Sequence, residues 1–135
     1  MAKAFLDYEF QAAGAQVAVT ARALNDPAPS VASEAVEVMH GYGLDVSRHQ
    51  PTRISDVDVQ EADLFLLMDH ELVEGARKRW PDAEAKIHRI MEYATGEPSD
   101  IGDPYLGNDA LYSMAAKRLR RAATAIAKKL TTEET

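Results

Sequence analysis

The sequence predicts an α/β fold with three layers (α/β/α), in which a parallel sheet lies between two layers of helices. Segments of strand type alternate along the chain with segments whose apolar residues recur at helical spacing. The clearest strand, residues 62–68 with the sequence ADLFLLM, is apolar nearly throughout, which is typical of a parallel strand buried on both faces. A wound α/β domain normally opens with a strand, whereas this chain opens with a helix, so a strand is expected to be missing at the front.

The first half of the chain predicts two helices and one strand. Residues 2–13 carry an apolar stripe at helical spacing, and Gly14 is a suitable stop signal. Residues 16–20, QVAVT, are rich in β-branched side chains and predict a short strand. Residues 31–42 again show helical spacing, and Gly43 is expected to end that helix.

The second half predicts two further strands and the remaining helices. Residues 55–58 resemble a capping box for a short helical turn. The strand over residues 62–68 is followed by Asp69, which can cap the next helix. Residues 86–91, KIHRIM, predict the third strand, and residues 109–130 predict a long amphipathic helix.

The length of 135 residues indicates one domain, which we expect to span residues 1–130, followed by a disordered tail over residues 131–135. The longest apolar run is too short to cross a membrane, and no targeting peptide is recognisable, so we expect a cytoplasmic protein. The net charge of −7 argues against binding to nucleic acid. We interpret the basic residues of the last predicted helix as a solvated face: Lys117, Arg118, Arg120, Arg121, Lys128 and Lys129.

The chain contains no cysteine, which excludes disulfides, thiolate metal sites and thiol nucleophiles within these residues. His70 and Glu74 have an i, i+4 spacing that can bind a metal ion. Because two ligands do not make a metal site, we interpret them as a surface pair on a helix and expect no metal and no cofactor.

The segment DIGDPYLGND, residues 100–109, precedes the last predicted helix. Its proline, two glycines and three acids predict a mobile loop that presents Asp103 and Tyr105 to a ligand. The alternative is that Asp103 is only a turn residue, because Asp-Pro is common in turns.

Three stretches resemble the low-molecular-weight protein tyrosine phosphatases, a family that includes bacterial protein arginine phosphatases. They are GLDVSRH at residues 43–49, ADLFLLMD at residues 62–69 and DPYLGND at residues 103–109. The opening MAKAFL is also similar to the start of the family's first helix. Order and spacing agree over nearly the whole chain.

The resemblance implies a reaction through a phosphocysteine, formed in a C-x5-R loop that binds the phosphate. It implies that Asp103 is the general acid and base, that Tyr105 is a wall for the substrate's ring, and that His49 and Pro104 support the site. The implied substrate is a phosphorylated protein or a small phosphomonoester.

The chain departs from the family because the C-x5-R loop and the strand before it are not in the sequence, and no cysteine is present. We therefore predict that the chain as given is inactive, so its status as an enzyme stays uncertain. It is interpreted as a phosphatase truncated at its front or read from an internal start. The alternative is an intact, non-catalytic relative that acts as a binding or regulatory module.

The resemblance also implies that three of the family's usual four strands are present. The absent strand would lie between residues 16–20 and residues 62–68, so two strand edges would lose their partner. We therefore expect reduced stability or self-association through these edges.

A less favoured reading is a receiver-like domain in which Asp69 accepts phosphate. That reading would need an acidic pair after an early strand, but residues 21–25 read ARALN and contain no acid.

Overall fold

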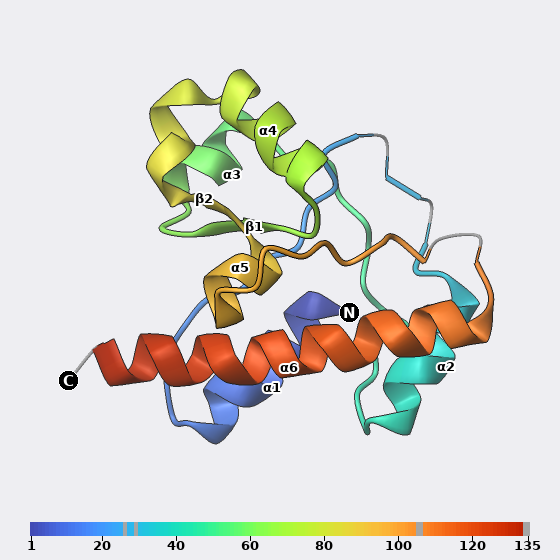
Figure 1. The fold of residues 1–135 in the computed structure, drawn as a ribbon. Helices are drawn as coiled ribbons and strands as arrows, with labels where there is room; N and C mark the ends of the chain where they lie inside the picture. Colours follow the sequence, from blue (N-terminus) through green and yellow to red (C-terminus); the bar gives the residue numbers. More distant parts are fainter. Residues whose placement is uncertain (26, 29, 105–106, 134–135) are drawn as a thin grey trace.

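The computed structural model describes residues 1–25, 27–28, 30–104 and 107–133. Helices dominate it, and two short strands lie at its centre (Figure 1). The elements in chain order are α1 (Ala2–Ala12), α2 (Ser33–Gly41), α3 (Asp56–Glu61), β1 (Phe65–Leu67), α4 (His70–Arg79), the 3-10 helix η1 (Pro81–Lys86), β2 (Ile87–Arg89), α5 (Ile90–Thr95) and α6 (Asp109–Glu133).

The two strands form a parallel sheet, in which Phe65 pairs with Ile87 and Leu67 pairs with Arg89. Helix α4 and η1 make the crossover between the strands, as parallel pairing requires. Side chains alternate across the sheet: Leu66 faces one apolar cluster, and Phe65 and Leu67 face the other. The predicted arrangement of helices on both faces of a parallel sheet is confirmed.

The larger apolar cluster lies on one side of the strands and is formed mainly by α1, α2, α5 and α6. Helix α4 covers the other side, and Figure 1 shows the strands between these two groups of helices. The fully buried residues at the centre of the larger cluster are Met39, Met91, Ile101, Leu119 and Ile126. This cluster matters for the site because Ile101 belongs to the loop that carries Asp103.

The predicted strand over residues 16–20 does not form. The structure has only an isolated parallel bridge nearby, between Ala23 and Arg53. Residues 15–21 nevertheless alternate strictly between half-buried and exposed side chains, and Val17 and Val19 pack on the larger cluster. The sequence therefore specifies an extended segment correctly, but a strand needs a hydrogen-bonded neighbour, and the described sheet contains only β1 and β2. Two strands are observed instead of three.

The other two predicted strands are present but shorter than expected. Strand β1 covers Phe65–Leu67 within the predicted residues 62–68. Strand β2 ends at Arg89, and Ile90 and Met91, predicted as strand, begin helix α5. Both side chains are buried in the larger cluster, and an apolar run of this length does not distinguish a strand from a buried helical turn.

Most predicted helices and caps are confirmed. Ser55 and Asp58 form the capping box of α3, and the Asp69 side chain accepts a hydrogen bond from the backbone N–H of Leu72, at 2.7 Å, at the start of α4. Helix α6 continues to Glu133, so residues 131–133 are helical and do not belong to the disordered tail that we expected. In the described part of the chain, no helix is long and apolar enough to span a membrane.

Candidate active site

The loop between α5 and α6 carries the predicted acid, and we call residues 97–104 the acid loop. Helix α5 ends at Thr95 and is followed by Gly96, whose φ of 80° is a left-handed conformation that favours glycine. The backbone N–H of Ile101 donates to the carbonyl of Met68, just after β1, at 2.9 Å. The Ile101 side chain is 1% exposed. The middle of the acid loop is therefore fixed to the sheet and to the core.

The predicted acid follows this fixed point by two residues. Asp103 is exposed to solvent, and Pro104 is half-buried. Because a proline restricts the residue before it to extended conformations, Pro104 limits the backbone states available to Asp103. Tyr105, the predicted wall for a substrate ring, lies outside the described residues.

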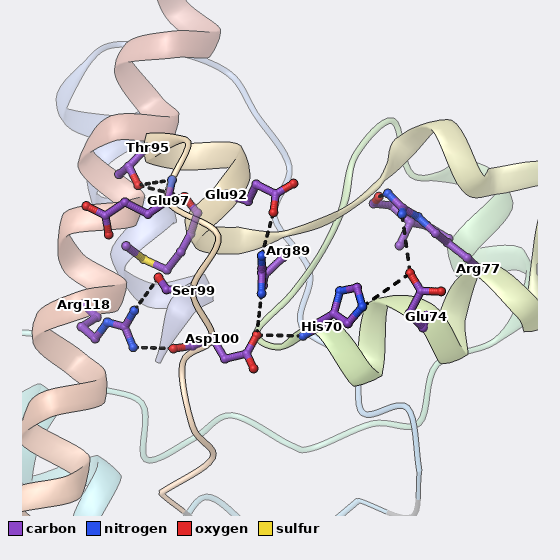
Figure 2. A network of polar contacts seen from close by, with 12 residues as sticks. His70, Glu74, Arg77, Arg89, Glu92, Thr95, Glu97, Ser99, Asp100 and Arg118 are labelled. Carbon is purple, nitrogen blue, oxygen red and sulfur yellow. Dashed lines mark hydrogen bonds and ion pairs between the residues drawn. The ribbon is translucent and has the colours of Figure 1, made fainter.

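Asp100 connects the acid loop to α4 and β2 (Figure 2). Its Oδ1 accepts a hydrogen bond from the backbone N–H of His70 and another from Arg89 Nη1, each at 2.9 Å. The second guanidinium nitrogen of Arg89 donates to Glu92 at 2.7 Å. The hydrogen bond from Arg89, followed by that from His70, lowers the pKa of the Asp100 carboxyl below its ordinary value.

Helix α6 holds the same loop from its other side. Arg118 donates to the carbonyl of Asp100 and, at 2.8 Å, to the hydroxyl of Ser99. Further along the helix, Arg121 donates to Glu97 at 2.9 Å, and both of these side chains are largely exposed. Our interpretation of the α6 cations as a merely solvated face is therefore wrong for Arg118, which binds the acid loop.

The predicted support residue His49 lies in a positively charged environment. Burial lowers the pKa of the His49 imidazole, and the positive charges of the Met1 amino group, Lys3 and Arg22 lower it further. Arg22 is itself paired with Asp58 at 3.2 Å. Lys3 lies in the first turn of α1, where the helix dipole adds a further positive potential. Lys3 is likewise paired with Asp7, at 2.6 Å.

The predicted site residues therefore occupy two regions. The first is the acid loop, with Asp103 and Pro104. The second, which we call the cationic region, consists of His49 together with Lys3 and Arg22, whose positive charges act on its imidazole. His70 Nε2 and Glu74 Oε1 are 4.0 Å apart, and both side chains are exposed, as expected of a surface pair. In the ranges that the structure describes, no cluster of three metal-ligating side chains is found.

The model of the low molecular weight phosphotyrosine protein phosphatase family matches residues 1–135. The chain belongs to this family. It is also 32% identical over 87 residues to EpsP of Ralstonia nicotianae, a probable low molecular weight protein-tyrosine-phosphatase. That match covers 64% of this chain and 58% of the relative, so the matched stretch spans little more than half of the relative's length.

Solved structures of the family have the same fold. The YwlE arginine phosphatase from Geobacillus stearothermophilus is 23% identical, with a TM-score of 0.89, over 98% of this chain and 84% of that chain. The low molecular weight protein tyrosine phosphatase from T. tengcongensis is 26% identical, with a TM-score of 0.88, over 95% of this chain and 88% of that chain. The three-layer α/β fold is therefore that of the low molecular weight phosphatases.

Three residues hold the acid loop in ways that were not predicted from the sequence: Asp100, Arg89 and Arg118. Asp100 is within the quoted loop, but nothing near it in sequence shows that it bonds to a residue 30 positions earlier. Arg89 was assigned only to a strand, and Arg118 only to a helix. The single available signal was an acid three residues before Asp103.

Proposed function

We propose that this chain carries the general acid of a low molecular weight phosphatase, and that Asp103 is that acid. The proposal rests chiefly on the family match over the whole chain, because the matched residues include the DPYLGND motif at residues 103–109. In the proposed reaction a cysteine thiolate displaces the leaving oxygen from phosphorus, and Asp103 donates its proton to that oxygen. The Asp103 carboxylate then takes a proton from the water that hydrolyses the phosphocysteine.

The cationic region is the proposed place for the phosphate. The N–H groups in the first turn of α1 can donate to phosphate oxygens, and Lys3 and Arg22 can contribute positive charge. The lowered pKa of His49 leaves its imidazole uncharged at neutral pH. Tyr105 and Pro104 retain their predicted roles in substrate contact and loop support, as proposals. No metal or cofactor is required by this chemistry.

The chain alone is proposed to be inactive, because none of its 135 residues is a cysteine. A proton donor and an anion site do not replace a nucleophile, and loss of one member of a cooperating catalytic set lowers the rate by about 10⁴ to 10⁶. We propose that the nucleophile belongs to a segment outside these residues, as in a truncated or miscalled phosphatase.

The intact mass of the protein made from its native locus tests whether the nucleophile belongs to a segment outside these residues. We expect a mass above 14.8 kDa, together with one cysteine that reacts with an alkylating reagent. A mass of 14.8 kDa without such a cysteine would contradict the proposal and would identify a non-catalytic relative that acts by binding or regulation.

The substrate is proposed to be a phosphorylated protein or a small phosphomonoester. One structural neighbour is named an arginine phosphatase and another a protein tyrosine phosphatase, at nearly equal similarity, so phosphoarginine and phosphotyrosine are both candidates. The cytoplasmic location remains a prediction.

We further propose that the chain associates with itself through two strand edges. Residues 16–21 make no backbone hydrogen bond to another described segment, and β1 pairs only with β2 in the described sheet. Such edges favour pairing with a second chain. Sedimentation at increasing protein concentration should show a rising average mass; a monomer at every concentration would contradict self-association.

A further inference from the structure

Three consecutive residues of the acid loop are held by different parts of the fold. The Ser99 hydroxyl accepts from Arg118 of α6, and the Ile101 N–H donates to Met68 after β1. Between them, the Asp100 carboxylate accepts from His70 and Arg89. The Asp100 side chain is therefore bonded both to the start of α4 and to the last residue of β2.

The two donors to Asp100 are well placed to fix it. The His70 N–H belongs to the first residue of α4, so its position is set by the helix. The Arg89 side chain is only 13% exposed and is held at its other end by Glu92. A guanidinium fixed from two sides has little rotamer freedom left to lose when it binds a carboxylate.

Capping of α4 does not account for this arrangement. Asp69 already caps that helix through the N–H of Leu72. Asp100 accepts a different N–H, that of His70, and comes from a segment 30 residues away in sequence. The bond therefore joins the loop to the helix, in addition to satisfying a donor at the helix start.

We propose that Asp100 is a positioning residue that fixes the acid loop and thereby the place of Asp103. This inference rests on the proposed role of Asp103 as general acid. Gly102 separates Ile101 from Asp103, and glycine has more backbone freedom than any other residue. With residues 99–101 fixed, Asp103 can move only through the few bonds that follow. Without the Asp100 carboxylate, the loop loses its hydrogen bonds to α4 and to Arg89, and Gly102 and Asp103 gain freedom. Displacements of about 1 Å in a catalytic group can cost about a hundredfold in rate.

The test measures the loop in the 135-residue chain, without turnover. Asp100→Ala is compared with Glu97→Ala, a matched control that removes another arginine-paired acid of the same loop; the partner of Glu97 is Arg121 of α6. Amide exchange and backbone order parameters are measured by NMR. In Asp100→Ala we expect the His70 amide to exchange about tenfold faster or more, and the order parameters of Gly102 and Asp103 to fall. In Glu97→Ala we expect both to stay near the wild-type values.

Asp100→Asn is the second variant, because it keeps an oxygen acceptor for His70 and Arg89 but loses the charge. We expect it to restore most of the order of Gly102 and Asp103. The proposal is overturned if Asp100→Ala leaves the loop as ordered as Glu97→Ala does. It is also overturned if protection is lost throughout α6, because Asp100 would then support the whole fold and not the loop. Neither result depends on whether Asp103 protonates a leaving group, which a turnover assay of the longer protein that supplies the cysteine decides separately.

Discussion

The acid loop and the segment after α1 differ in how completely this chain supports them. In the acid loop, Ser99, Asp100 and Ile101 each bond to a different part of the fold. In residues 16–21, side chains alternate as in a strand, but the backbone makes no hydrogen bond to another described segment. The chain therefore fixes the acid loop by its own contacts, while the segment after α1 makes no backbone hydrogen bond to another described segment.

The largest effect on stability is expected from the point where the acid loop enters the core. Ile101→Ala should lower the free energy of unfolding by about 2–5 kcal/mol, because it removes a fully buried side chain and leaves a cavity. Val19→Ala, in the half-buried segment after α1, should cost less, about 1 kcal/mol or below. Urea denaturation of both variants measures this difference. Equal losses would mean that the two regions are supported to the same degree.

A smaller effect is expected from the cationic region. The pKa of His49 is lowered in the folded state, so the unfolded chain binds more protons as the pH falls below about 6.5. The free energy of unfolding should therefore decline from pH 7 toward the lowered pKa of the folded state. His49→Gln should remove this part of the decline, which is small because solvent screens a half-buried group.

Denaturation of the wild-type chain and His49→Gln at several pH values between 7 and 5 checks this expectation. Arg22→Gln is the matched variant, since it removes one of the charges that lower the pKa of His49 and should reduce the decline in part. An identical pH dependence in wild type and His49→Gln would show that folding does not lower the pKa of this imidazole.

The sequence predicts the fold well where local signals and burial agree. The stripe of Phe5, Leu6 and Phe10 places α1, and the capping box at Ser55 places α3. It fails where a structure depends on partners outside the segment. Residues 16–20 have strand-forming side chains but no strand to pair with, and α5 was missed because Ile90 and Met91 suit a buried strand equally well.

The site is predictable only in part, for the same reason. Asp103 stands out because Asp-Pro-Tyr is a compact motif read from adjacent residues. The contacts of Asp100 with His70, Arg89 and Arg118 join segments that lie far apart in sequence. No periodicity or local spacing encodes such contacts, so they emerge only once the chain is folded.

The central claim is that these 135 residues contain a phosphatase's acid but not its nucleophile. The most direct test is the rate at which the purified chain hydrolyses an aryl phosphate, measured beside Asp103→Asn. We predict that both rates equal that of buffer alone. Sustained hydrolysis that scales with protein concentration, and that Asp103→Asn reduces, would contradict the account, because a nucleophile would then have to exist among the residues present.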